Sequence, residues 1–101
     1  MPANEASLLL GAQIDFHSIF GRFTEVSPAR AEAFDRLVHE GMQQLEQFPH
    51  SAPFHIGRYQ RLLLGKLPYA LFYAVEGHRV FVHAILDIRQ PREVIARRLG
   101  V

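Results

Sequence analysis

The feature that most constrains the fold of this chain is a change in the spacing of its apolar residues near residue 55. Before this point apolar side chains recur at spacings of three and four, and after it they alternate with polar ones. Helices followed by strands are typical of the α+β class. We therefore predict one domain over residues 1–101, with a helical hairpin over about 5–48, a sheet over about 55–89 and a C-terminal segment over 90–101.

The first half of the chain is predicted to form two amphipathic helices. Asn4 is the expected N-cap of the first helix, while Ser27 caps the second, which has Pro28 in its first turn and ends at Pro49. The apolar stripes consist of Leu9, Ala12, Phe16, Ile19, Phe20 and Phe23, and of Ala31, Phe34, Leu37, Val38, Leu45 and Phe48. Because only "TEVS" links them, the two helices are expected to lie antiparallel.

The second half is predicted to form three strands, over residues 59–64, 69–75 and 79–88, joined as an antiparallel meander. Gly65 and Pro68 turn the chain after the first strand, and "EGH" forms the next turn around Gly77. A short extended piece is expected within "HSAPFHIG". The tail "QPREVIARRLGV" has the ends of a short helix, with proline at its start and glycine at its end.

Strict alternation along the strands predicts which side chains face the helices. Five apolar residues of the last strand should face the helices, namely Val80, Val82, Ala84, Leu86 and Ile88, leaving Phe81, His83, Ile85, Asp87 and Arg89 on the other face. In the first strand, Leu62 faces inward while Tyr59 and Arg61 face outward. Arginines should therefore frame an open sheet face, although an ordinary solvated face has the same pattern.

Charge is unevenly distributed along the chain. Residues 1–50 carry three arginines and seven carboxylates, whereas residues 51–101 carry eight lysines and arginines and three carboxylates. The basic half is expected to face nucleic acid or an acidic partner, unless the two halves attract each other. The lack of cysteine, of a signal-peptide pattern and of an apolar run of ~20 residues favours a soluble, cytoplasmic protein without membrane contact.

Motifs of metal or cofactor enzymes are not apparent. The six histidines form no H-x-x-x-H pair, the seven glycines form no phosphate-binding loop, and no serine or cysteine lies in a nucleophile motif. The sequence therefore predicts neither a metal nor a cofactor, and it disfavours an enzyme of small-molecule metabolism.

An ordered set of short motifs over residues 5–98 resembles the RelE/ParE superfamily, the bacterial toxins of type II toxin–antitoxin modules that are often called plasmid stabilisation proteins. The set consists of Leu45, Phe48 and Pro49 at a helix end, Arg61-Leu62 in a strand, Pro68-Tyr69 opening the next strand, Tyr73, Val75 and Gly77 in a hairpin, and Arg89 before Pro91. The resemblance implies a helical hairpin packed on a small antiparallel sheet.

The resemblance also implies a function that depends on a partner. Members of this superfamily are neutralised by a cognate antitoxin, with which this chain would form a hetero-oligomer. Members of the ParE branch inhibit growth by acting on DNA gyrase, and members of the RelE branch are endoribonucleases that cleave messenger RNA on the ribosome. The ParE branch, which is not enzymatic by itself, is favoured because "QPREVIARRLGV" lacks the tyrosine, histidine or lysine common in the RelE branch. A non-toxic interaction domain is the third alternative.

Two further expectations follow from the resemblance. The candidates for catalysis are Arg61, His83 and Arg89, and those for binding a partner or nucleic acid are Tyr59, Arg61, His83, Asp87, Arg89 and Arg92. Members of the superfamily usually begin with a strand, whereas only Met1 to Asn4 precede the predicted first helix. The sheet is therefore expected to lack that strand.

Overall fold

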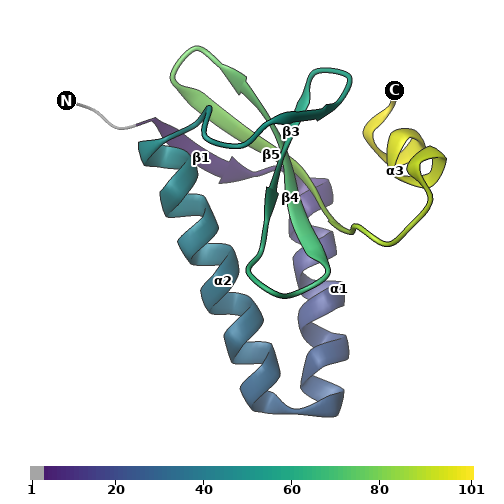
Figure 1. Ribbon diagram of the computed structural model, residues 1–101. Coiled ribbons are helices and arrows are strands. Elements are labelled where there is room, and N and C mark those ends of the chain that lie inside the picture. The colour runs from purple at the N-terminus through teal and green to yellow at the C-terminus, as the bar shows by residue number, and fades with distance from the viewer. Residues whose placement is uncertain (1–3) are drawn as a thin grey trace.

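The computed structural model describes residues 4–101 (Figure 1). Met1 to Ala3, which precede the predicted first helix, lie outside the described residues. The elements are β1 (Glu5–Leu8), α1 (Leu10–Val26), α2 (Pro28–Gln47), β2 (Phe54–Ile56), β3 (Tyr59–Leu63), β4 (Tyr69–Glu76), β5 (Arg79–Asp87) and α3 (Arg92–Leu99).

The strands form one mixed sheet with the order β1-β5-β4-β3-β2. Strands β2 to β5 are the expected antiparallel meander, and β1 adds to its edge parallel to β5. Figure 1 shows α1 and α2 as a hairpin that extends from one side of the sheet, with α3 on another side. The α+β fold and the helical hairpin on a sheet are thus confirmed.

The expectation that the first strand is missing is wrong. Glu5–Leu8 form β1, where the Glu5 amide donates to the His78 carbonyl at 2.9 Å, and the first helix begins only at Leu10. Asn4 is therefore not its N-cap, which is Leu9. The segment alternates between exposed and half-buried residues. Its inward side chains Ala6 and Leu8 pack against the core between the sheet and the helical hairpin.

All residues of the predicted apolar stripes except Phe48 are buried or half-buried. Phe34 and Leu45 of α2 are fully buried, Ile19 of α1 is nearly so, and the "TEVS" linker is reduced to Ser27 between the two helices. Pro28 occupies the first turn as expected, although the Ser27 side chain makes no capping hydrogen bond. Phe48 was predicted in the stripe but is 61% exposed, because α2 ends at Gln47 and the chain turns away.

A β-bulge in β5 reverses the predicted faces of its second half. Phe72 lies opposite Ala84 and the next residue, Tyr73, lies opposite Val82, so His83 is an extra residue in β5. Val80 and Val82 face the helices as predicted. Beyond the bulge the predictions are wrong, because Ile85 packs against the helices whereas the other face holds Ala84, Leu86 and Ile88.

The second face of the sheet is not open, because α3 covers part of it. Ile95 and Leu99 are buried against a second apolar core formed by Ile56, Tyr59, Ala70, Phe72, Ala74, Ala84 and Leu86. The helix ends as predicted at Gly100, whose positive φ of 77° closes the last turn. The central strand β4 is consequently apolar on both faces, which explains the continuous apolar run in its sequence.

Candidate functional site

Three arginines, two histidines and one tyrosine gather on the sheet face that carries α3. We call this set the arginine cluster, and it consists of His55, Arg58, Tyr59, Arg61, His83 and Arg92. The predicted alternation of side chains along β3 is correct here, because Leu62 packs on the face covered by the helical hairpin and Tyr59 belongs to the core on the face covered by α3. The structure thus brings together four of the predicted binding residues, which are Tyr59, Arg61, His83 and Arg92.

His55 of β2 joins two of these arginines. Its Nε2 lies 3.4 Å from Nη1 of Arg61, and its backbone carbonyl accepts a hydrogen bond of 3.4 Å from Nη1 of Arg92. Because a guanidinium can only donate, His55 Nε2 accepts and its proton resides on Nδ1. Burial, together with the charges of Arg61 and Arg92, lowers the pKa of His55 below its ordinary 6.5. This side of the cluster therefore combines the two cations Arg61 and Arg92 with a neutral imidazole.

His83, the residue inserted by the bulge, contacts the Tyr59 ring. The two rings meet edge to face with centroids 5.0 Å apart, and the Arg58 guanidinium lies 5.0 Å from the Tyr59 ring centre. Burial first, and then the charge of Arg58, lowers the pKa of His83, against a smaller raising effect of Glu76. Its Nε2 is buried without a hydrogen-bond partner among residues 4–101. Both histidines of the cluster are therefore held neutral.

The free energy of unfolding is expected to fall as the pH drops from about 7.5 to about 5. Between the lowered pKa values of His55 and His83 and their ordinary 6.5, the unfolded chain binds more protons than the folded one, so acid favours unfolding. Urea unfolding at several pH values measures this slope. The variant His55→Gln/His83→Gln should show a shallower slope, and an unchanged slope would contradict the assignment.

Asp87 and Arg89 do not join the arginine cluster. Arg89 donates to Asp87 through Nη2 at 2.7 Å and Nε at 3.0 Å, and these bonds hold the pKa of the Asp87 carboxyl below its ordinary value. Asp87 was predicted to face away from the helices, but after the bulge it faces α1. Arg89 is paired with Asp87 beside α1, and α3 covers part of the other sheet face, so the expected frame around one open face does not form.

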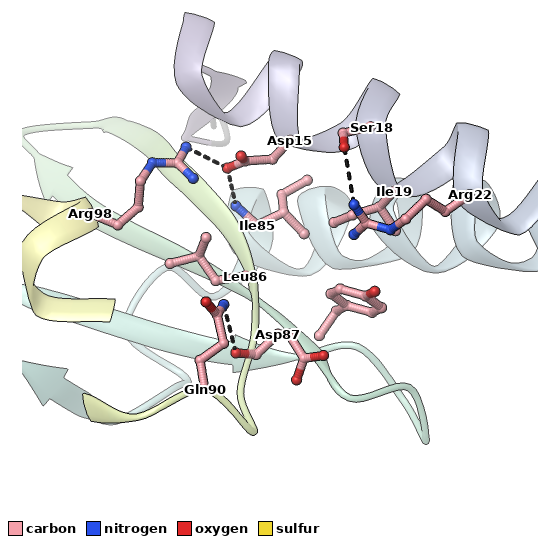
Figure 2. Close-up of a pocket in the computed structure, with 10 residues that line it drawn as sticks. Asp15, Ser18, Ile19, Arg22, Ile85, Leu86, Asp87, Gln90 and Arg98 are labelled. Atoms are coloured by element: carbon pink, nitrogen blue, oxygen red, sulfur yellow. Dashed lines mark hydrogen bonds and ion pairs between the residues drawn. The ribbon is translucent and has the colours of Figure 1, made fainter. Parts of the chain in front are cut away.

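A polar cleft of about 340 Å³ lies between α1, the end of β5 and the C-terminal segment (Figure 2). Asp15 of α1, with only 12% of its side chain exposed, accepts a hydrogen bond of 3.0 Å from the Ile85 amide and pairs with Arg98 at 2.7 Å. Arg22 donates to the Ser18 hydroxyl at 3.2 Å. Gln90 lines the opposite wall and donates to the Asp87 carbonyl at 3.2 Å. The cleft therefore presents charges of both signs.

Several of these residues were not predicted from the sequence, namely Asp15, Arg22, His55, Arg58 and Arg98. His55 had a weak signal, because it lies in the short extended piece that precedes the arginine-bearing strand. Asp15 and Arg98 are 83 residues apart, and no local pattern pairs them. A signal for Asp15 was its position as a carboxylate next to the apolar stripe of the first helix, three residues after Ala12 and four before Ile19.

Two properties of the described part of the chain, residues 4–101, bear on the class of site. Its helices include none that is long and apolar enough to cross a membrane. Its histidine and carboxylate side chains form no group of three that could hold a metal ion.

The chain matches no model of a known protein family and no curated protein sequence. Its structure is nevertheless similar to a solved one, and the sheet with its helical hairpin defines the class as the ParE-like toxin fold. The similar chain belongs to a structure described as the chromosomal ParDE TA (toxin–antitoxin) system from P. aeruginosa. The TM-score is 0.73 at 17% sequence identity, over 84% of this chain and 96% of that chain. The fold expected from the sequence is thereby confirmed.

Proposed function

We propose that this chain is the toxin of a type II toxin–antitoxin module, that it inhibits bacterial growth by acting on DNA gyrase in the cytoplasm, and that a cognate antitoxin neutralises it. The observation that carries the proposal is the structural similarity to a chain of a ParDE system over 84% of the present chain. The ordered motifs that resemble the RelE/ParE superfamily support it independently, because they depend on residue types and spacings rather than on the course of the backbone.

The arginine cluster is the proposed contact with the target. Arg61, half-buried, and Arg92, exposed, have no carboxylate partner among residues 4–101, so both remain available to an anionic surface. In the same cluster, the buried Tyr59 ring meets the half-buried His83 ring edge to face. Asp87 and Arg89 are proposed as a separate contact at the end of β5, where their ion pair is solvent-exposed on the arginine side.

Co-expression with the small reading frame next to its gene tests the pairing. The two products should co-purify as one complex, and the host should tolerate expression of both together but not of the toxin alone. The proposal of a toxin–antitoxin pair would fail if the folded chain purified alone and remained harmless in the presence and the absence of that product.

Ribosome-dependent cleavage of messenger RNA is the second candidate function, and one observation favours it. The neutral imidazole of His55 lies beside Arg61 and Arg92, so a proton acceptor and two anion-binding groups are adjacent. Activation of a 2′-hydroxyl needs a group that moves a proton, and the phosphate transition state needs nearby cations.

The two targets are distinguished by following chromosomal DNA and transcripts after induction. Action on gyrase predicts DNA breaks that precede any change in transcripts, and His55→Gln should weaken them by no more than about tenfold, as the loss of one contact of the arginine cluster would. Ribonuclease action predicts rapid transcript cleavage with intact DNA, which His55→Gln should slow by about 10²-fold or more. The second result would replace gyrase by messenger RNA as the target.

A further inference from the structure

One arginine of the polar cleft makes no direct ion pair within the described part of the chain. Asp15 is paired with Arg98, and Asp87 is paired with Arg89, each at 2.7 Å. Arg22 has no ion pair among residues 4–101 and donates only to the neutral Ser18 hydroxyl, while its charge acts from a distance on Asp87, whose carboxylate is already paired with Arg89. Figure 2 shows Arg22 and Ser18 on α1, with Asp87 and Gln90 on the opposite wall. An anionic group in the cleft would compensate this guanidinium.

Exposed apolar side chains continue the same flank of α1. Ile14, Ser18 and Arg22 are spaced by four residues and are therefore neighbours along the helix surface, and Leu10 lies one turn before Ile14. Leu10 is 71% exposed and Ile14 is 60% exposed, so two large apolar side chains meet solvent next to each other on this flank. The flank thus places an apolar strip directly beside Arg22.

We infer that this flank of α1 is a docking surface for an acidic segment of a partner protein, in which a carboxylate side chain enters the polar cleft to pair with Arg22 and apolar side chains cover Leu10 and Ile14. The inference deepens the proposed function, because the expected partner is the antitoxin, and to that extent it rests on it. An arginine that becomes buried on binding and is surrounded by apolar contacts is typical of protein interfaces.

The composition of the cleft favours a protein carboxylate over nucleic acid. A phosphate backbone presents a run of anions, whereas the cleft offers one free guanidinium and also contains the carboxylates of Asp15 and Asp87. A single carboxylate can form a bidentate pair with Arg22 and still accept a hydrogen bond from Ser18.

Peptide titration tests the surface without reference to any antitoxin. The probes are a short synthetic peptide in which leucines flank one glutamate, a twin with glutamine in its place, and inorganic phosphate. In amide NMR spectra the glutamate peptide should shift the signals of Ser18, Arg22 and Asp87 more than either other probe does. The variant Arg22→Gln should lose this response, and Arg30→Gln, which removes an exposed arginine of α2, should keep it. Equal responses to the two peptides, or none, would overturn the inference.

Affinity for the product of the neighbouring reading frame extends the test to the proposed partner. Arg22→Gln should weaken that complex by about tenfold or more, because a charged contact is lost. Ile14→Ser should weaken it as well, and Arg30→Gln should not. Binding that both α1 variants leave unchanged would reject the docking surface and retain the toxin–antitoxin pair. If the glutamate peptide binds at the cleft but the neighbouring product does not bind the chain, the docking surface stands and the proposed partner fails.

Discussion

Replacing Phe34 with alanine is expected to lower the free energy of unfolding by about 3–5 kcal/mol. Phe34 of α2 is fully buried. The centroid of its ring lies 5.4 Å from the ring centroid of Phe16, 5.6 Å from that of Phe23 and 5.9 Å from that of Tyr69. It therefore joins α2 to α1 and to the sheet, and its truncation leaves a cavity among rings too rigid to fill it. Domains of this size have total stabilities of about 5–15 kcal/mol, so the loss would be a large fraction.

Urea unfolding followed by circular dichroism measures this change. Phe54→Ala is the matched control, because Phe54 in β2 is 67% exposed and its truncation should shift stability by only about 0.5 kcal/mol. A change at Phe34 no larger than that of the control would mean that the aromatic core does not hold the hairpin on the sheet.

The second large effect is expected at the arginine cluster. Changing Arg61 and Arg92 together to glutamine should lower affinity for the target by about a hundredfold, since each well-placed charged contact contributes about 1.5–3 kcal/mol. Growth inhibition should be largely lost. The unfolding free energy should change by only about 0.5 kcal/mol per site, because Arg92 is exposed and Arg61 is half-buried. Function and stability should therefore separate.

Colony counts after induction and urea unfolding of the same variants measure the two quantities. Arg30→Gln/Arg79→Gln removes two other exposed arginines and keeps the overall charge change the same, so it should retain growth inhibition. If the cluster variant unfolds like the parent and inhibits growth equally, Arg61 and Arg92 belong to an ordinary solvated surface.

Elements with a clear period could be predicted from the sequence. The strands predicted at 59–64, 69–75 and 79–88 form at Tyr59–Leu63, Tyr69–Glu76 and Arg79–Asp87, because Gly65 and Gly77 supply the positive φ angles of the intervening turns. The strand Glu5–Leu8 was missed because its alternation spans only four residues and continues into a leucine run that also fits a helix.

The bulge at His83 could not be predicted, since period-two analysis assumes that no residue is inserted. "HAILDI" is apolar at several successive positions, so either face assignment places an apolar residue inward. In the structure both faces carry apolar residues, because Ile85 packs on the face covered by α1 and α2 and Leu86 packs on the face covered by α3. A sheet covered on both sides leaves less open surface than the sequence suggested, and the arginine cluster is confined to the margin of α3.

The polar contacts across the fold were equally hidden. Asp15, Ile85 and Arg98 come from three elements that meet only in the folded chain. Arg61 was identified by its place in a strand, but His55 is brought beside it by a two-residue connection between β2 and β3. Arg61 could therefore be found from alternation in its own strand, whereas the contacts that other elements make with it required the structure.

Growth after induction of the chain in a bacterial host is the direct test of a toxin function. Growth should stop when the chain is expressed alone and resume when the product of the neighbouring reading frame is supplied. A cooperative urea transition of the chain purified from the same cells must show that it is folded. Unimpaired growth of cells that contain the folded chain would contradict the assignment as a toxin, whatever the similarity of its fold.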